Sequence, residues 1–480
     1  MIVGELRHGQ LVIIDRLRET VRLSEGLSKD GNLGEDARYR AIQCLCRFGQ
    51  RLRDMQAGSV RAAGTSALRR ARNSQDFILD AEAALGQQIE IISGIEEARL
   101  IYNGVSNSLP PSEGTRLVLD IGGGSTELIL GEKAKPTALE SLQLGCVAMT
   151  EKYFEQGRLS KSAFRKARMA ASLELRPVKA FFRDARALEV IGTSGTIIST
   201  EAVSRELRII ESQDLTSDSV ESLIQEVLKY DDTAALSLPG LCERRAQVWP
   251  GGLAILVELI KVLHIDKLQI SDGALREGLL YDHLGRLQHS DARERSIRAM
   301  ASRYNVDQAQ AKRVAQTARI LLDQCAETWN LTLPIAANVL DWASQLHEIG
   351  LDISHDGYQR HGAYIAENAD LPGFPRAEQR LLAFLIASQG RQLVIAHTEN
   401  PAGGTWRDSA LRLALLLRLA VLLNRSRTTV ELPTVGLEVD DVSMSLTFPR
   451  EWLGENPLTL ADLEREQNFL KIAGISLDFI

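Results

Sequence analysis

Three consecutive glycines between two apolar segments restrict the fold of this chain more than any other feature. Residues 117–130 read Leu-Val-Leu-Asp-Ile-Gly-Gly-Gly-Ser-Thr-Glu-Leu-Ile-Leu. Short apolar runs bounded by glycine are typical of strands, so the pattern predicts a tight hairpin that turns at Gly122, Gly123 and Gly124. Glycine has no side chain to cover its backbone N–H group, and three such groups can converge on a phosphate. The segment predicts a phosphate-binding turn; a flexible glycine hairpin without a ligand is the alternative.

The residues next to the glycines have the chemistry that a phosphate site needs. Ser125 and Thr126 carry hydroxyl donors, and Asp120 can hold a divalent cation that neutralises phosphate charge. Glu127 is a second candidate metal ligand, although side chains alternate along a strand and this one could face solvent. No lysine follows the glycines, so the segment is not a P-loop of the Gly-x4-Gly-Lys-Ser/Thr type.

Two short segments recur along the chain at nearly the same offset. Gly64-Thr65-Ser66 recurs as Gly192-Thr193-Ser194, and Ile2-Val3-Gly4-Glu5 recurs as Ile129-Leu130-Gly131-Glu132. A shared offset favours a duplicated βα half-domain over coincidence. The same offset would put the glycine turn of the first half just ahead of Met1. We therefore expect the first of two phosphate turns to be missing from this chain.

The bulk composition is that of a globular protein with several domains. The chain has 480 residues, of which 44% are hydrophobic and 25% charged, and its net charge is −7. This balance argues against a nucleic-acid-binding protein, so a polyanionic substrate would need a local basic channel. Arg69, beside the turn that contains Ser66, is the arginine we expect to contact phosphate. Ser194 and Gly195 are expected to form a second wall of the site.

Several features indicate a cytoplasmic protein, with peripheral association with a membrane left open. The five cysteines form no Cys-x-x-Cys pair and fit small buried side chains in a reducing compartment. Polar residues follow Met1 closely, so no signal peptide is apparent. The longest apolar run, residues 413–423, is interrupted by Arg418 and is too short to span a bilayer, which predicts a core helix.

Five segments together resemble the exopolyphosphatase/guanosine pentaphosphate phosphohydrolase (Ppx/GppA) family, and the resemblance extends over essentially the whole chain. The segments are Asp-Ile-Gly-Gly-Gly-Ser-Thr-Glu at 120–127, Ile-Ser-Gly-Ile-Glu-Glu-Ala-Arg at 92–99, Gly-Thr-Ser-Gly-Thr at 192–196, Pro-Gly-Gly-Leu-Ala-Ile-Leu at 250–256 and Ser-Asp-Gly-Ala-Leu-Arg-Glu-Gly at 271–278. The family's first strand ordinarily ends in an Asp-x-Gly-Ser-x-Ser loop, and this chain opens after that point. We expect a trimmed or mis-assigned start; loss of half of the phosphate cradle is the alternative.

The resemblance implies a fold and a domain order. It implies two actin-like (ribonuclease H-like) α/β domains at 1–101 and 102–288, a helical HD-like domain at 289–428, and a small C-terminal α+β domain at 429–480. It also implies a homodimer and Mg²⁺ as the cofactor, with K⁺ as a second candidate cation. Strand-like alternation at 437–439 and 444–448 supports the last of these domains.

Glu97 is the candidate catalytic base. Ser93 and Glu96 have the spacing of a helix capping box, which gives Glu96 a structural role and leaves Glu97 to point elsewhere. In the resembled family, the glutamate before the Ala-Arg pair activates the attacking water, and that role maps onto Glu97. The alternative is an acidic residue that only stabilises the start of a helix.

The helical segment contains a histidine group that resembles HD-type metal phosphohydrolases. His347-Glu348, with His355, His361 and His397, has Glu where those enzymes have Asp, and the spacing defines no metal shell. We expect buried or hydrogen-bonded histidines rather than a second metal site.

Three functions fit these observations. The first is an exopolyphosphatase that hydrolyses terminal phosphate from inorganic polyphosphate, ranked first because Asp-Leu-Pro-Gly-Phe at 370–374 and the glycine turn resemble exopolyphosphatases slightly more. The second is a 5′-phosphohydrolase of guanosine pentaphosphate (pppGpp), with the same chemistry on a nucleotide. The third is a non-catalytic sensor of phosphate or of this nucleotide, which the missing first turn allows.

Overall fold

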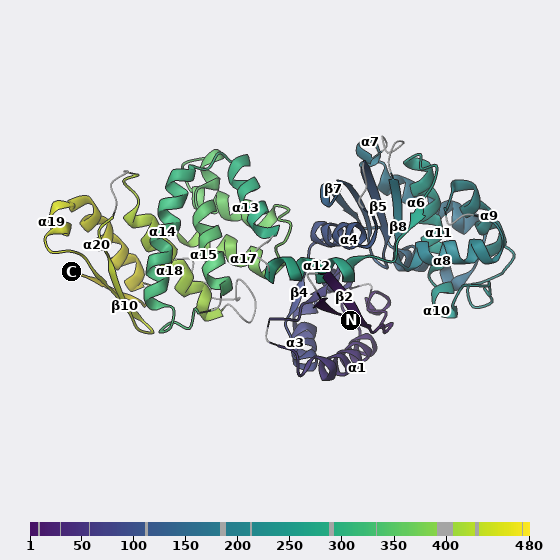
Figure 1. Cartoon of the computed structure of the whole chain (residues 1–480), viewed down its shortest axis with the longest axis horizontal. Coiled ribbons are helices and arrows are strands. Elements are labelled where there is room, and N and C mark those ends of the chain that lie inside the picture. Colours follow the sequence, from purple (N-terminus) through teal and green to yellow (C-terminus); the bar gives the residue numbers. More distant parts are fainter. Residues whose placement is uncertain are drawn as a thin grey trace. The chain divides into compact units, whose positions relative to one another are not determined.

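The computed structural model describes residues 1–7, 10–28, 30–56, 58–110, 114–182, 189–211, 214–287, 292–332, 334–390, 407–427, 432–472 and 474–480. The chain divides into two compact units, Met1–Asp291 and Ala292–Ile480. Each unit has its own hydrophobic core, and the two are described separately below (Figure 1).

The first unit is a mixed α/β structure. In chain order its elements are β1 (Ile2–Arg7), β2 (Gln10–Arg16), η1 (Ser24–Gly26), α1 (Glu35–Leu52), β3 (Ala62–Gly64), α2 (Ser66–Arg70), α3 (Ser74–Leu85), β4 (Ile89–Ile91), α4 (Gly94–Ser108), β5 (Thr115–Ile121), β6 (Thr126–Glu132), β7 (Lys135–Leu142), α5 (Cys146–Tyr153), η2 (Glu155–Gly157), α6 (Lys161–Leu175), α7 (Lys179–Phe182), β8 (Glu189–Thr193), α8 (Ser194–Glu206), α9 (Ser217–Val227), α10 (Glu243–Ala246), α11 (Trp249–Val262), β9 (Gln269–Ile270) and α12 (Leu275–Leu287).

A five-stranded sheet with the order β7-β6-β5-β8-β9 forms the centre of this unit. β5 pairs antiparallel with β6 and parallel with β8, so the predicted hairpin around the three glycines is confirmed. The register places Asp120 opposite Glu127 across the hairpin and beside Thr193 of β8. The glycine turn and the Gly-Thr-Ser-Gly-Thr segment therefore lie at the same edge of the sheet.

Helices cover both faces of this sheet. Residues of α5, α6, α8, α9 and α11 form one core with Leu117, Leu119 and Ile121, whereas α4 packs on the other face against Val118 and Ile129. Figure 1 shows α4 and the α6/α11 group on opposite sides of β5 and β8. Since side chains alternate along a strand, Asp120 lies on the face that α4 covers.

Two glycines allow α12 to pack closely on α4. A Cβ atom at Gly104 would lie 2.0 Å from the Ala274 carbonyl oxygen, and one at Gly278 would lie 1.7 Å from the Leu100 carbonyl oxygen. Any side chain at either position would therefore force the helices apart. The predicted domain boundary at residue 101 falls inside α4, which joins the two halves of the unit.

The first half of the unit, before α4, contains two small sheets. β1 and β2 form an antiparallel hairpin, and β3 and β4 form a parallel pair. α1 and α3 pack on a core that includes Leu33, Phe77 and Ala81. The residues of β4 are only half-buried.

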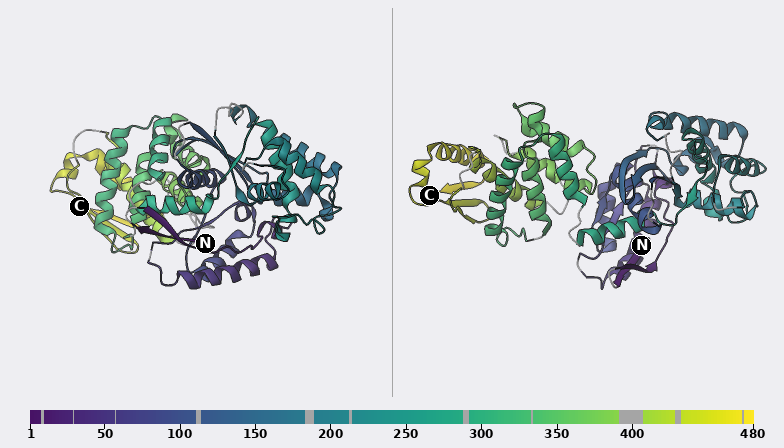
Figure 2. Two further views of the ribbon diagram at one scale, coloured as in Figure 1. Left: turned by 45° about the vertical axis from the view of Figure 1, so that its right-hand side comes forward. Right: turned by 45° about the horizontal axis from the view of Figure 1, so that its top comes forward.

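The second unit is mainly helical and closes with a small sheet (Figure 2). Its elements are α13 (Ala292–Arg303), α14 (Gln308–Cys325), α15 (Pro334–Leu346), η4 (Ile349–Asp352), α16 (Tyr358–Asn368), α17 (Arg376–Ser388), α18 (Arg407–Leu423), β10 (Gly436–Val439), β11 (Ser443–Thr447), α19 (Trp452–Glu455), α20 (Pro457–Ile472) and β12 (Ser476–Phe479). The two predicted strands correspond to β10 and β11, and β12 pairs parallel with β11. Residues of the helices and of this sheet belong to one hydrophobic core.

The apolar run at 413–423 is a core helix, as predicted. It forms most of α18, and Leu413, Leu416 and Leu419 are completely buried. Arg418 is buried as well, and its guanidinium donates to both carboxylate oxygens of Glu466 at 2.6 and 2.7 Å. Among the described residues, no helix is both long enough and apolar enough to cross a membrane.

Candidate active site

The glycine turn has backbone N–H groups available for a ligand. The Gly122 N–H donates to the Ser125 carbonyl at 2.9 Å, which closes the turn. The first N–H groups of α5 donate to the Gly122 and Gly123 carbonyls at 2.9 and 3.0 Å and hold the turn against that helix. Within the described part of the chain, the N–H groups of Gly123, Gly124 and Ser125 have no hydrogen-bond partner. Three unpaired N–H groups in a row can bind an anion, and phosphate binding at this turn stays a prediction.

Other chain segments lie directly against Gly124 of the turn, and the turn itself lies directly against Gly145. A Cβ atom at Gly124 would lie 2.6 Å from the Ser66 hydroxyl oxygen. A Cβ atom at Gly145, the residue before α5, would lie 2.3 Å from the Gly123 carbonyl oxygen. The first half of the unit therefore reaches the turn through Ser66.

Three carboxylates lie on one side of the sheet. Asp120 is 9% exposed, Glu127 1% and Glu97 8%. Glu127 and Asp120 face each other on β5 and β6, on the face covered by α4, and Glu97 stands in the first turn of α4. The solvent-facing alternative for Glu127 is wrong, because α4 covers this face of the sheet.

Their surroundings raise the pKa values of all three carboxylates. Burial raises the pKa of Asp120 to about 7, with a further contribution from the charge of Glu97. Burial, Glu97 and Asp120 raise the pKa of Glu127 well above its usual range, while hydrogen bonds from Ser125 and Ser141 oppose the shift. Ser141 donates to Glu127 at 2.8 Å. Clusters of carboxyl groups with strongly shifted pKa values are typical of functional sites.

Arg69 holds Glu97 in place. Its Nη1 atom donates to Glu97 Oε2 and to the Ile92 carbonyl oxygen, both at 2.9 Å. Burial raises the pKa of Glu97, and Arg69 opposes that shift because it favours the charged carboxylate. Sequence reasoning assigned Arg69 to phosphate; the structure instead pairs its guanidinium with the candidate base.

Glu96 has a structural role, in which the capping contact with Ser93 was predicted and the pairing with Arg99 was not. The Ser93 hydroxyl accepts from the Glu96 N–H at 3.0 Å and caps α4, which starts at Gly94. The Glu96 carboxylate accepts two hydrogen bonds from Arg99, at 2.7 and 2.8 Å. Glu96 is therefore neutralised, and of the two adjacent acids only Glu97 faces Asp120 and Glu127.

The donor set at Asp120 and Glu127 fits a magnesium ion. Neither carboxylate forms an ion pair within the described residues, so their buried negative charge lacks a cation. Over the same residues, no group of three or more His, Cys, Asp or Glu side chains has the arrangement to hold a metal by itself. Mg²⁺ usually takes one or two carboxylates and completes its octahedron with water and substrate phosphate. Two carboxylates beside the candidate phosphate turn meet that requirement, and a metal at this position stays a prediction.

Two predicted contacts of the site differ in the structure. Thr126 is completely buried and its hydroxyl donates to the Leu144 carbonyl, so it is not available to a phosphate. Ser194 has a left-handed backbone with φ of 85°, and its hydroxyl accepts from the Ile121 N–H at 3.3 Å, which ties this loop to the end of β5. A Cβ atom at Gly195 would lie 2.1 Å from Nη2 of Arg245.

Sequence reasoning missed several residues at this edge of the sheet. Ser141 hydrogen-bonds Glu127, Arg245 lies against Gly195, and Arg70 lies near Gly124. Each comes from a segment that carries no recognisable motif. Arg70 adjoins Arg69, and no sequence pattern distinguishes the two.

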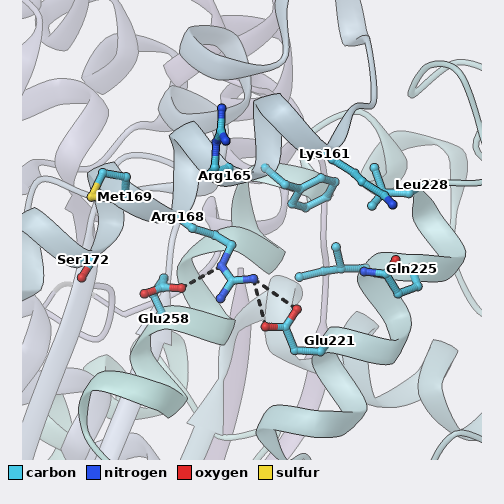
Figure 3. Close-up of a pocket in the computed structure, with 11 residues that line it drawn as sticks. Lys161, Arg165, Arg168, Met169, Ser172, Glu221, Gln225, Leu228 and Glu258 are labelled. Carbon is cyan, nitrogen blue, oxygen red and sulfur yellow. Dashed lines mark hydrogen bonds and ion pairs between the residues drawn. The ribbon is translucent and has the colours of Figure 1, made fainter.

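The first unit also has a cavity of about 380 Å³ away from the glycine turn (Figure 3). It lies among α6, α9 and α11, which cover the sheet face opposite α4. Figure 3 shows Arg168 between Glu221 and Glu258, at 2.9 and 2.7 Å. This arginine is already neutralised, and the cavity contains none of the candidate catalytic residues.

The histidine group of the second unit forms no recognisable site where the chain is described. His347 is completely buried, its Nδ1 atom lies 2.7 Å from the Ser344 carbonyl oxygen, and burial lowers its pKa to about 4. Glu348 pairs with Arg427, and His355 lies beside the ring of Tyr358. His397 lies outside the described residues. His347 is thus a buried, hydrogen-bonded histidine, as expected.

Comparisons with known proteins identify the family of this chain. Residues 2–287 match the Ppx/GppA phosphatase family, and residues 292–467 match domain III of Ppx/GppA phosphatases. A guanosine-5′-triphosphate,3′-diphosphate pyrophosphatase of Aeromonas hydrophila is 37% identical over 466 residues, which cover 97% of this chain and 93% of the relative. A protein of the same name from Vibrio atlanticus is 37% identical over 471 residues, 98% of this chain and 93% of the relative.

Solved structures show the same fold. The crystal structure of the Aquifex aeolicus member of the Ppx/GppA family is 27% identical, with a TM-score of 0.50, and covers 59% of this chain and 94% of its own. An exopolyphosphatase from Cytophaga hutchinsonii, 23% identical with a TM-score of 0.54, covers 59% of this chain and 93% of its own and supports the fold alone. The expected mixed α/β fold of the actin-like Ppx/GppA enzymes is confirmed, whereas the HD-like character of the helical segment stays a prediction. This chain is a member of the Ppx/GppA phosphatase family.

Proposed function

We propose that this phosphatase removes the terminal 5′-phosphate of guanosine pentaphosphate (pppGpp). Its relatives from Aeromonas hydrophila and Vibrio atlanticus, which are 37% identical over nearly the whole chain, carry the name of that activity. The structure named as an exopolyphosphatase is only 23% identical. These comparisons favour the nucleotide over inorganic polyphosphate and reverse the order in which the sequence alone ranked the two substrates.

One observation carries the proposal of hydrolysis. Glu97, held by Arg69, faces two further buried carboxylates next to a turn with three unpaired N–H groups. Phosphoryl transfer has a transition state with negative charge spread over several oxygens, so positioning and charge stabilisation matter most. This arrangement supplies donors for the phosphate and a base for the water in one place.

In the proposed reaction each group has a defined task. The N–H groups of Gly123, Gly124 and Ser125 bind the non-bridging oxygens of the terminal phosphoryl group. Glu97, whose charged form Arg69 favours, orients a water molecule and accepts its proton as the water oxygen bonds to phosphorus. The bond from phosphorus to the bridging oxygen breaks, and the electron pair leaves with the remaining nucleotide. Mg²⁺ held by Asp120 and Glu127 would neutralise phosphate charge when bound.

Glu97→Gln tests this assignment. The amide keeps the size of the side chain but cannot accept a proton, so phosphate release should fall by roughly 10²- to 10⁴-fold while substrate binding persists. Glu132→Gln, an exposed glutamate on β6, is the matched control and should keep full activity. Phosphate release is measured on pppGpp and on polyphosphate side by side.

The outcomes separate the competing functions. Faster release from pppGpp supports the proposal, and faster release from polyphosphate favours an exopolyphosphatase. No release from either, with tight nucleotide binding retained, would indicate a sensor. Unchanged activity of the Glu97 variant would remove Glu97 from the mechanism.

A further inference from the structure

Two consecutive arginines of α2 have different surroundings. Arg69 is partly buried and committed to Glu97 and the Ile92 carbonyl oxygen. Arg70 is exposed and forms no ion pair or hydrogen bond with the residues that the structure describes. Its Nη1 atom would lie 3.5 Å from a Cβ atom at Gly124, so the guanidinium lies close to the unpaired N–H groups of the glycine turn. Arg70 is thus an uncommitted cation at the candidate active site.

Arg70 also lines a cavity of about 150 Å³ beside the turn. Elements of both halves of the first unit form the cavity: the segment around η1, α2, the glycine turn and α5. Its lining residues are Ser24, Leu27, Ser28, Gly31, Arg70, Gly123, Val147, Ala148 and Glu151. The cavity therefore adjoins the predicted position of the terminal phosphate and contains two hydroxyl groups and one guanidinium.

Among the described lining residues, Glu151 is the only acid. Burial and the charge of Glu25 raise the pKa of its carboxyl, and the charge of Arg70 opposes the shift without a direct ion pair between them. Arg70 therefore keeps its guanidinium available for a ligand. Guanidinium binds phosphate oxygens in pairs, whereas a charged carboxylate in the same cavity repels further phosphate groups.

We propose that this cavity is a second phosphate subsite, in which Arg70 binds the phosphoryl group that stays with the departing product. The inference rests on the proposed function, because it assumes that the terminal phosphate is held at the glycine turn. When the bridging bond breaks, negative charge appears on the oxygen of this second phosphoryl group. A cation at that position stabilises the charge as it develops, which accelerates the reaction more than it tightens substrate binding.

Arg70→Ala tests the subsite, with Arg51→Ala on α1 as the control, since Arg51 is likewise exposed but lies outside the cavity lining. Binding of inorganic pyrophosphate and inorganic phosphate is measured by calorimetry, and hydrolysis of pppGpp in parallel. A lost charge-assisted contact should weaken pyrophosphate binding by about 10- to 100-fold and lower kcat by a similar factor. Phosphate binding at the glycine turn should change much less. Arg70→Lys should restore part of both losses.

The two proposals fail in different ways. Pyrophosphate binding and kcat equal to the wild type in Arg70→Ala, with the protein folded and pppGpp hydrolysed, would overturn the subsite alone. A wild type that binds pyrophosphate through Arg70 but releases phosphate from neither pppGpp nor polyphosphate would overturn the proposed hydrolysis. Equal loss of phosphate and pyrophosphate binding would also contradict the subsite, because Arg70 would then act on the glycine turn itself.

Discussion

The two halves of the first unit each contain an antiparallel hairpin and a parallel pair of strands. Among the described residues, only the second half has a central strand, β5, that joins the hairpin to the pair. In the second half the order is β7-β6-β5-β8-β9, in which β6 and β7 form an antiparallel hairpin and β8 and β9 a parallel pair. In the first half, β1 and β2 form the antiparallel hairpin, and β3 and β4 the parallel pair. Within the described residues no strand takes the place of β5, so these pairs remain separate two-stranded sheets.

This difference explains how the candidate site is divided. β5 provides Asp120 and leads into the glycine turn, so among the described residues the candidate phosphate turn and the candidate metal ligands come from the second half. The first half supplies groups that reach over to them, namely Ser66, Arg69 and Arg70 from α2 or its edge. Glu97 lies on α4, the helix that joins the halves.

The sharpest test of this division is Asp120→Asn, because the described first half has no corresponding acid. Loss of one metal ligand should lower Mg²⁺-dependent phosphate release by on the order of 10³-fold. Asp218→Asn, at an exposed position of α9, is the control. Activity of Asp120→Asn within threefold of the wild type would show that the metal, if used, is held elsewhere.

Amide hydrogen exchange would compare the five-stranded sheet directly with the two two-stranded sheets. β5 and β8 are paired on both sides, whereas β1 and β3 each pair with one strand among those described. We expect amides of Val118 and Leu119 to exchange at least about 10-fold more slowly than those of Val3 and Ala63, since fully paired core strands open least often. Equal protection of the amides in the five-stranded sheet and in the two two-stranded sheets would contradict this difference between the halves.

The smallest expected effect is a pH-dependent stabilisation by Mg²⁺. Burial raises the folded-state pKa of Asp120 to about 7, above the value of roughly 3.9 for an unfolded chain. The folded protein therefore holds a proton that the unfolded chain has lost, and this group costs stability as the pH rises towards 7. A cation offsets that cost only once the carboxyl is deprotonated.

Mg²⁺ should accordingly raise the Tm by a few degrees more at pH 8 than at pH 5.5, on the scale of about 1 kcal/mol. Asp120→Asn should remove this difference and should make the metal-free protein more stable at pH 8. Thermal unfolding with and without the ion measures both. The same Mg²⁺ shift at both pH values would contradict the link to Asp120.

Several parts of this protein follow from the sequence alone because their causes are local. Three glycines between apolar runs can form only a tight turn between strands, and this is the β5–β6 hairpin. Ser93 caps the helix that carries Glu97, since capping depends on residues three positions apart. The run at 413–423 forms a buried helix because all of its residues except Arg418 are apolar.

Only the tertiary structure decided the roles that depend on distant neighbours. Glu127 is buried rather than exposed because α4 covers that face of the sheet, and Thr126 is unavailable because the Leu144 carbonyl lies within reach. Arg69 and Arg70 are adjacent in sequence, yet one meets an acid 28 positions away and the other faces a cavity. The local backbone determines the direction in which a side chain points. The residues that it contacts depend on which distant segments the fold brings beside it.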